Sequence, residues 1–255
     1  MQNSTEIMSS KPEFVIVPGA WHGPESFKPT SDLLSKEGYT SHGITLPSVG
    51  ANPQVQSFTP DAEATKAVLD KVLSSGKDVV LIYHSYGGVV GSEALAEYVK
   101  EGPKPGWGKV KRLVYVCAFA LPEGSSLMAA LQFKPLPWFI LDKPDIVEAA
   151  NPQEILYNDI SPQSLVDELI SKIQTHSYPT FSSQLTVAPW KTIPSTYILC
   201  EKDNAIPIFA QEGMVAAAKA MAPNAFDTVE RVDASHSPFI SQPEWLAEKL
   251  VKAAQ

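Results

Sequence analysis

Short apolar runs alternate along the chain with longer stretches in which apolar residues recur every three or four positions. A short run bounded by Gly or Pro, such as Phe14–Val17 before Pro18-Gly19, is typical of a strand buried on both faces. The runs therefore predict strands over residues 14–17, 39–46, 79–83, 113–117, 196–200 and 227–232.

The stretches between these runs have the spacing of helices packed on one side. They predict helices over 25–37, from Thr59 or Asp61 to near Gly76, and over 89–100, 208–221 and 243–253. Strands that alternate with helices form right-handed crossovers and a largely parallel sheet with helices on both faces. The pattern therefore predicts an α/β fold with an open sheet.

Residues 121–190 interrupt this alternation. Prolines are scattered through them, so they cannot form one regular element. Because the segment lies between two core strands and is rich in aromatic residues, including Trp138, we interpret it as an inserted helical cap over the carboxyl edge of the sheet. An irregular surface excursion is the alternative. The expected division is a flexible leader at 1–12, a core formed by 13–120 and 191–255, and a cap at 121–190.

Composition narrows the class of protein. Hydrophobic residues make up 44% of the chain and charged residues 19%, which favours a globular fold over disorder. The net charge of -8 disfavours a nucleic-acid partner, because such binding depends on clustered Lys and Arg. No window approaches the roughly 20 apolar residues of a membrane span, and residues 1–12 lack a signal-peptide run. We therefore expect a cytoplasmic monomer or homodimer that binds neither nucleic acid nor membrane.

Ser85 follows a predicted buried strand and precedes a predicted helix, in Tyr83-His84-Ser85-Tyr86-Gly87. This context is typical of a nucleophile elbow, whose sharp turn raises the serine hydroxyl above the sheet. The amide of Tyr86 then faces the charge that develops during attack. Tyr83 departs from the usual G-x-S-x-G pattern, so a reshaped elbow is expected. A serine that only caps the helix is the alternative.

A serine nucleophile needs a base, which is expected from a later loop at the same sheet edge. His236 follows the last predicted strand and precedes the last helix, so its imidazole can reach back over the elbow. Asp203 follows the strand at 196–200 and is the predicted acid, in the chain order Ser, Asp, His. Glu201 and Asp233 are the rival acids.

The loop after the first strand, Pro18 to Gly23, is expected to supply the second oxyanion donor. Ala20 is the predicted donor, with an ordinary glycine-containing turn as the alternative. Trp21, His22 and Trp138 are candidate substrate-binding residues. The five histidines show no metal-ligand spacing, so we expect no metal and no cofactor. Cys117 and Cys200 each end an apolar run and are expected to be buried thiols.

These motifs resemble the α/β-hydrolase superfamily, and within it the branch of plant methylesterases, hydroxynitrile lyases and microbial esterases. The resemblance rests on Phe14 to Gly23, on His84 to Gly88, on Asp203 with Pro207, and on His236. It implies the same roles for Ser85, Asp203, His236, Ala20 and Tyr86. Cyanogenic lyases of the branch carry a lysine directly after the histidine, where this chain has Ser237. Cyanohydrin cleavage is therefore disfavoured.

Haloalkane dehalogenases and epoxide hydrolases of the superfamily carry an aspartate at the elbow. Ser85 at this position excludes their chemistry in its usual form. The resulting hypothesis is a serine hydrolase that cleaves an ester of a small, largely apolar substrate through an acyl-enzyme. A lyase or cyclase that uses the same triad on a secondary metabolite is one alternative. A ligand receptor without turnover is the other, because a fold does not determine its chemistry.

Overall fold

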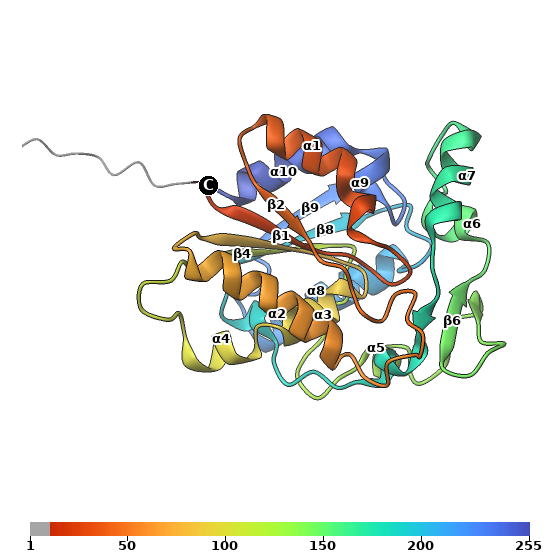
Figure 1. The fold of residues 1–255 in the computed structure, drawn as a ribbon, viewed down its shortest axis with the longest axis horizontal. Helices are drawn as coiled ribbons and strands as arrows, with labels where there is room; N and C mark the ends of the chain where they lie inside the picture. Colours follow the sequence, from red (N-terminus) through yellow and green to blue (C-terminus); the bar gives the residue numbers. More distant parts are fainter. Residues whose placement is uncertain (1–10) are drawn as a thin grey trace, which may run out of the picture.

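The computed structural model describes residues 11–255, so the predicted leader lies almost wholly outside the described residues. Its main sheet is parallel throughout, with strand order β2-β1-β3-β4-β8-β9 (Figure 1). The strands are β1 (Glu13–Val17), β2 (Ser41–Gly43), β3 (Val79–His84), β4 (Val110–Val116), β8 (Ser195–Cys200) and β9 (Thr228–Val232). The predicted α/β-hydrolase architecture is confirmed, although the strand expected over 39–46 shortens to β2.

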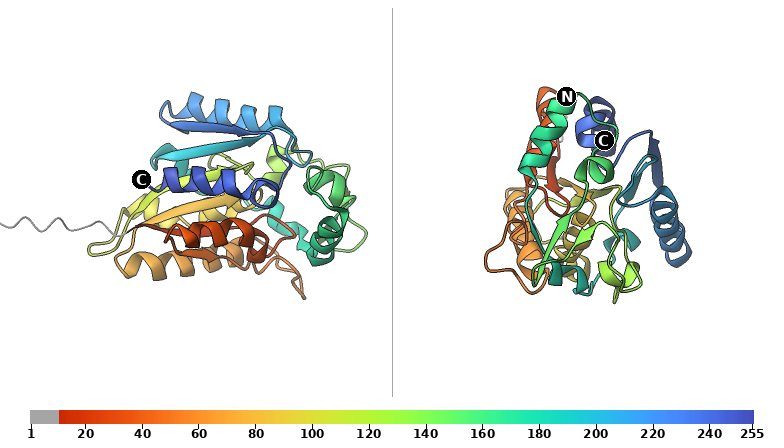
Figure 2. Two further views of the ribbon diagram at one scale, coloured as in Figure 1. Left: turned by 90° about the horizontal axis from the view of Figure 1, so that it is seen from above. Right: turned by 90° about the vertical axis from the view of Figure 1, so that its right-hand side faces the viewer.

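Helices cover both faces of this sheet (Figures 1 and 2). Along β1, Phe14 and Ile16 pack with one set of helices, and Val15 and Val17 face the other, as the period of two in a strand requires. One face is covered by α1 (Lys28–Lys36), α9 (Pro238–Ser241) and α10 (Pro243–Ala253), and the other by α2 (Thr59–Ser74), α3 (Gly87–Glu93) and α8 (Ile208–Met221).

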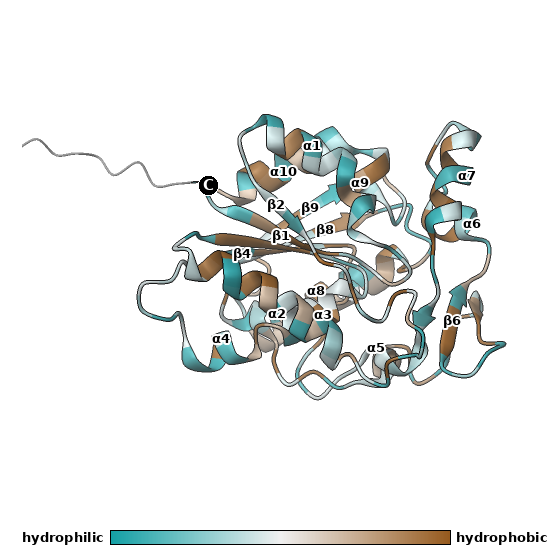
Figure 3. Cartoon of the chain, viewed as in Figure 1, coloured by the Kyte–Doolittle hydropathy of each residue, from teal (hydrophilic) through white to brown (hydrophobic). Residues whose placement is uncertain are grey.

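The central strands are the most apolar part of the chain, and polar residues lie mainly on the outer helix surfaces (Figure 3). Phe14, Val80, Ile82 and Val114 are almost completely buried. Each such side chain stabilises the fold by roughly 1.5 to 3 kcal/mol relative to exposure. The sheet therefore forms a rigid base for the loops at its carboxyl edge.

The helix predicted over 89–100 is wrong in its extent. The structure has α3 and a separate α4 (Ala96–Glu101), with a break at Ala94 and Leu95. The Leu95 amide donates to the Ser92 carbonyl, three residues back, instead of continuing the four-residue pattern. Such a tightened turn is common where an α-helix ends. The helix also begins earlier than predicted, at Gly87, directly after the elbow.

Between β4 and β8 the chain forms short elements, most of which lie at one end of the sheet (Figure 1). They include an antiparallel sheet β5-β6-β7, so the expectation of a purely helical insertion is corrected to a mixed one. The elements are α5 (Leu127–Ala130), β5 (Phe139–Ile140), β6 (Ile146–Ala149), α6 (Pro152–Leu156), α7 (Gln163–Lys172), β7 (His176–Ser177) and the 3-10 helices η2 (Tyr178–Ser182) and η3 (Pro189–Lys191). A further 3-10 helix, η1 (Pro24–Phe27), precedes α1.

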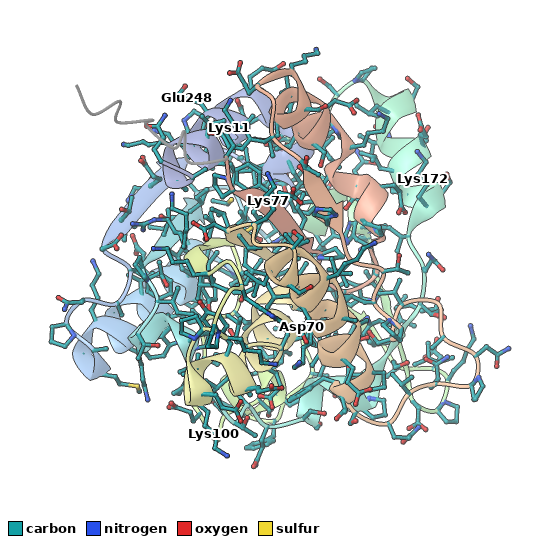
Figure 4. The ribbon with its side chains drawn as sticks, turned by 60° about the vertical axis from the view of Figure 1, so that its left-hand side comes forward. Lys11, Asp70, Lys77, Lys100, Lys172 and Glu248 are labelled. Carbon is teal, nitrogen blue, oxygen red and sulfur yellow. The ribbon has the colours of Figure 1, made fainter. Side chains whose placement is uncertain are left out.

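Most charged residues lie on the outside of the molecule, whereas Asp61 and Asp203 are buried. None of the six labelled in Figure 4 is buried, among them Lys100 on α4 and Lys172 on α7. In the described part of the chain, no helix combines the length and apolarity needed to cross a bilayer. Cys117 and Cys200 are buried free thiols, as predicted.

Candidate active site

Ser85 occupies the turn between β3 and α3 with a φ of 53°. A positive φ is uncommon for a residue other than glycine, and such strained positions cluster at functional sites. Gly87 and Gly88 make this turn sterically feasible. A β-carbon on Gly87 would lie 2.3 Å from the Val17 carbonyl oxygen, and one on Gly88 would lie 2.3 Å from that of Phe119. The geometry is that of a nucleophile elbow.

Tyr83, which replaces the usual first glycine of the motif, does not block the elbow. Its ring lies against Gly91 on α3, where a β-carbon would come within 2.3 Å of the ring. The Tyr83 hydroxyl donates to the Gly91 carbonyl at 3.0 Å. Gly91 thus provides the space for Tyr83, a signal eight positions downstream that the motif alone does not reveal.

His236 and Asp203 meet in the protein interior. The Nδ1–H of His236 donates to Asp203 Oδ2 at 2.7 Å, and both side chains are buried. Asp203 Oδ1 accepts from the amides of Ala205 and Ile206 at 2.7 and 2.8 Å. These donors stabilise the carboxylate and fix its direction.

Gln211 on α8 adds a further donor, with Nε2 at 3.2 Å from Asp203 Oδ2. Gln211 was not among the predicted site residues, although a polar residue on an otherwise apolar helix face is a usable signal. The rival acids lie elsewhere. Glu201 pairs with Arg231, and Asp233 pairs with Lys202.

Ser85 and His236 line the same pocket. Their side chains share no hydrogen bond, although both residues are described. Hydrogen bonds of this kind are often long before substrate binds and shorten in the reacting complex. A second histidine fixes the backbone of His236, because His84 Nε2–H donates to the His236 carbonyl at 2.8 Å. With Nδ1 committed to Asp203, Nε2 is the ring nitrogen that has no hydrogen-bond partner among the described residues.

The two predicted oxyanion donors also line this pocket. Within residues 11–255, neither the Ala20 amide nor the Tyr86 amide donates to another protein group, and both residues are buried. The Ala20 loop lies close to the elbow, since a β-carbon on Gly19 would be 2.9 Å from Ser85 Cβ. Two buried amides are therefore free to bind a negatively charged oxygen beside Ser85.

The rest of the pocket is aromatic and aliphatic. Trp21 and Trp138, both predicted candidates, pack with ring centroids 5.4 Å apart. Phe139 and Phe181 join them, with Phe181 edge-on to Trp21 at 6.3 Å. The cavity volume is about 20 Å³, little more than one water molecule needs. A molecule larger than this fits beside Ser85 only if side chains of the pocket move aside.

His22 does not line this pocket, and its role as a substrate contact stays a prediction. It is buried and lines a separate cavity of about 390 Å³ between α1 and α7. Its Nδ1–H donates to the Ala20 carbonyl at 2.8 Å, and Tyr157 donates to its Nε2 at 2.7 Å. Burial lowers the pKa of His22 to about 4. The neutral ring thus links Tyr157 to the Ala20 loop.

The structure also gathers three side chains that could ligate a metal. Atoms of His84, Cys117 and His236 lie within 4.8 Å of one another, although the sequence spacing shows no such group. His84 Nε2 already donates to the His236 carbonyl, and His236 Nδ1 donates to Asp203. Two ring nitrogens are thus committed to hydrogen bonds. The expectation that the protein needs no metal stays a prediction.

Comparison with known proteins places this geometry in a family. A family described as "Alpha/beta hydrolase family" matches residues 14–249. The chain belongs to the α/β-hydrolase family. Its relatives include Alpha/beta hydrolase nvfD of Aspergillus novofumigatus, which is 34% identical over 96% of this chain and 97% of its own length. Methylesterase 7 of Arabidopsis thaliana is 27% identical over 96% and 97%.

Solved structures agree on the fold of this α/β hydrolase. The crystal structure of polyneuridine aldehyde esterase superposes with a TM-score of 0.75 and 19% identity, over 96% of this chain and all of that one. The predicted resemblance to the branch that includes plant methylesterases is confirmed.

Proposed function

We propose that this α/β hydrolase is a serine esterase that cleaves a small, largely apolar ester through an acyl-enzyme. The observation that carries the proposal is the buried hydrogen bond of 2.7 Å from His236 to Asp203, because His236 also lines the pocket that contains Ser85. The pairing orients the imidazole and stabilises the imidazolium that forms when His236 takes a proton.

In the first half-reaction, His236 Nε2 takes the Ser85 proton while Ser85 Oγ attacks the ester carbonyl carbon. The amides of Ala20 and Tyr86 donate to the oxyanion. Collapse of this intermediate breaks the carbon–oxygen bond to the alcohol, and His236 returns the proton to the departing alkoxide. A water molecule then repeats the sequence on the acyl-enzyme, which releases the acid and restores Ser85.

The substrate class is inferred from the pocket walls. Trp21, Trp138, Phe139 and Phe181 surround Ser85, which suits an apolar acyl group with few polar contacts. Residues 121–190 supply three of these four, so we propose that they act as the cap of the site. The names of relatives such as Methylesterase 7 and "Carbendazim hydrolyzing esterase" of Nocardioides support ester cleavage as the reaction.

A panel of p-nitrophenyl esters of rising acyl length tests the proposal. The unmodified enzyme is expected to show a burst on short esters, and Ser85→Ala is expected to lose at least about 1,000-fold in kcat. Ser92→Ala is the matched control, because Ser92 is a buried serine of α3 that bonds Tyr115 outside the pocket. It should retain most activity.

A fluorophosphonate probe provides an independent measurement. It is expected to label Ser85 alone, as read by mass spectrometry of the labelled peptide. Ester hydrolysis at equal rates by the enzyme and Ser85→Ala would contradict the proposal. Activity on a carbon–carbon substrate with none on any ester would support a lyase or cyclase instead.

A further inference from the structure

We propose that Asp61, in the first turn of α2, is a positioning residue of this active site. Through the side chain of Tyr86 it holds the backbone amide that binds the oxyanion. The inference rests on the proposed function, because it assigns a task to a residue outside the triad. By its place in the chain alone, Asp61 is only a residue that could cap a helix.

Asp61 is completely buried and its contacts are specific. The Tyr86 hydroxyl donates to Asp61 Oδ2 at 2.8 Å, and the Ser48 amide donates to Oδ1 at 2.9 Å. Both oxygens thus accept from neutral donors. Burial raises the pKa of Asp61, and these donors oppose the rise. Burying a carboxyl group in this way costs stability that an apolar pair of similar volume avoids.

The group that Asp61 holds is directly beside the nucleophile. Tyr86 follows Ser85, and its ring lines the substrate pocket. The ring also packs edge-on against His176, with centroids 4.8 Å apart, and in a tilted arrangement against Phe181, with centroids 5.4 Å apart. A phenylalanine would fill the same space. The hydroxyl adds the bond to Asp61, which fixes the far end of the side chain.

The peptide between Ser85 and Tyr86 is then held from two sides. Its carbonyl oxygen accepts from the Gly88 amide at 3.0 Å and from the Phe119 amide at 3.1 Å. The bond to Asp61 holds the side chain on the opposite end of the Tyr86 residue. These restraints limit rotation of the peptide and keep its N–H directed at the reacting oxygen. Oxyanion stabilisation depends on such preorganised donors.

The test uses Asp61→Asn, Tyr86→Phe and the double variant in the full chain. Each single change leaves the Tyr86 amide in place but loosens it. We expect kcat to fall about tenfold, less than the 10²- to 10³-fold that follows removal of a donor, with KM changed by no more than about twofold. The double variant should be no slower than the worse single variant, because both changes break one interaction.

Affinity for a transition-state analogue separates positioning from simple stability. A trifluoromethyl ketone that forms a hemiketal with Ser85 is expected to bind each variant about tenfold more weakly, in parallel with kcat/KM. Thr65→Val is the matched control. Thr65 is buried on the same helix and donates to the Asp61 carbonyl at 2.9 Å, but the variant leaves the carboxyl group intact. It should lose stability and keep its kcat.

Two results would overturn the inference. One is a normal kcat and a normal analogue affinity in folded Asp61→Asn and Tyr86→Phe, even with a lowered melting temperature. The other is additive losses in the double variant. Tyr86→Phe is the milder change and keeps the test decisive if Asp61→Asn fails to fold. If Ser85→Ala stays active on esters, the proposed function fails first, which distinguishes the two failures.

Discussion

The two amides assigned to the oxyanion hole are supported in different ways. The Ala20 loop is tied by the neutral His22 ring to Tyr157, in the segment between β4 and β8. The Tyr86 residue is tied to the carboxyl group of Asp61, in the core helix α2. One support therefore depends on how the segment docks on the core, whereas the other lies within the core. We infer that a substrate whose entry moves side chains of this segment displaces the Ala20 loop more than it displaces Tyr86.

The electrostatic character of the two supports also differs. Burial lowers the pKa of His22 to about 4 and raises the pKa of Asp61. Both shifts favour the neutral form, because a low-dielectric interior penalises charge. The neutral form of histidine is favoured at high pH and that of a carboxyl group at low pH. The two sides should therefore respond to acid in opposite directions.

Removal of the Ala20 donor should have the largest effect in this comparison. Ala20→Pro eliminates the backbone N–H and is expected to raise the barrier by about 2.7 to 4 kcal/mol, a loss of 10² to 10³ in kcat. The measurement is kcat on a short p-nitrophenyl ester, with circular dichroism to confirm folding. Ala20→Ser keeps the amide and serves as the control. A folded Ala20→Pro enzyme with an unchanged kcat would show that Ala20 is not a donor.

A weaker effect on kcat is expected when the hydrogen bond from Tyr157 to His22 is removed, because His22 holds the Ala20 loop. Tyr157→Phe leaves the buried Nε2 of His22 without its donor, which should lower the free energy of unfolding by about 1 to 3 kcal/mol. The bond from His22 to the Ala20 carbonyl remains, so kcat should fall less than in Asp61→Asn.

Urea denaturation and ester kinetics measure both quantities for Tyr157→Phe. Tyr178→Phe is the control, because within residues 11–255 the Tyr178 hydroxyl makes only a long contact of 3.6 Å with Met128 Sδ. A larger kcat loss in Tyr157→Phe than in Asp61→Asn would reverse the proposed ranking of the two supports.

The pH dependence of stability is the smallest and most specific difference. Unfolded His22 binds a proton near pH 6.5 and folded His22 near pH 4, so acidification between these values favours unfolding by about 3 kcal/mol at most. His22→Asn should remove this part of the acid sensitivity. Asp61 has the opposite effect on stability. Its pKa is raised in the folded protein, so the native state binds a proton at a higher pH than the unfolded state does, and acidification then favours the native state.

Asp61→Asn should therefore lose more stability on acidification than the unmodified enzyme does. Urea midpoints measured at pH 7 and pH 4 for the three proteins test both signs, because the lower pH is close to the folded pKa of His22 and to the ordinary pKa of a carboxyl group. Parallel shifts in all three would mean that neither group carries the predicted linkage. His176, whose pKa is lowered by burial alone, contributes the same background to each protein. The pKa of His84 is lowered by burial and by the neighbouring His236 and His22, so His22→Asn also changes the contribution of His84.

Much of the sheet, and of the loops at its carboxyl edge, could be predicted from local sequence patterns. Buried parallel strands are continuous apolar runs, and their carboxyl ends meet at one sheet edge, so the loops that follow them converge. This convergence, together with chain order, is sufficient to predict that Ser85, Asp203, His236 and Ala20 come together. The roles of these residues stay predictions until the variants above are measured.

The sequence alone determined the core strands, the parallel order implied by the crossovers, and the loops that carry the candidate triad, because each depends on short-range periodicity and chain order. Only the tertiary structure decided that Gly91 accommodates Tyr83, that His22 turns toward Tyr157, and that Asp61 reaches Tyr86. These contacts join residues 8, 135 and 25 positions apart. Their partners are selected by packing and by the need to satisfy buried polar groups, which no local pattern records.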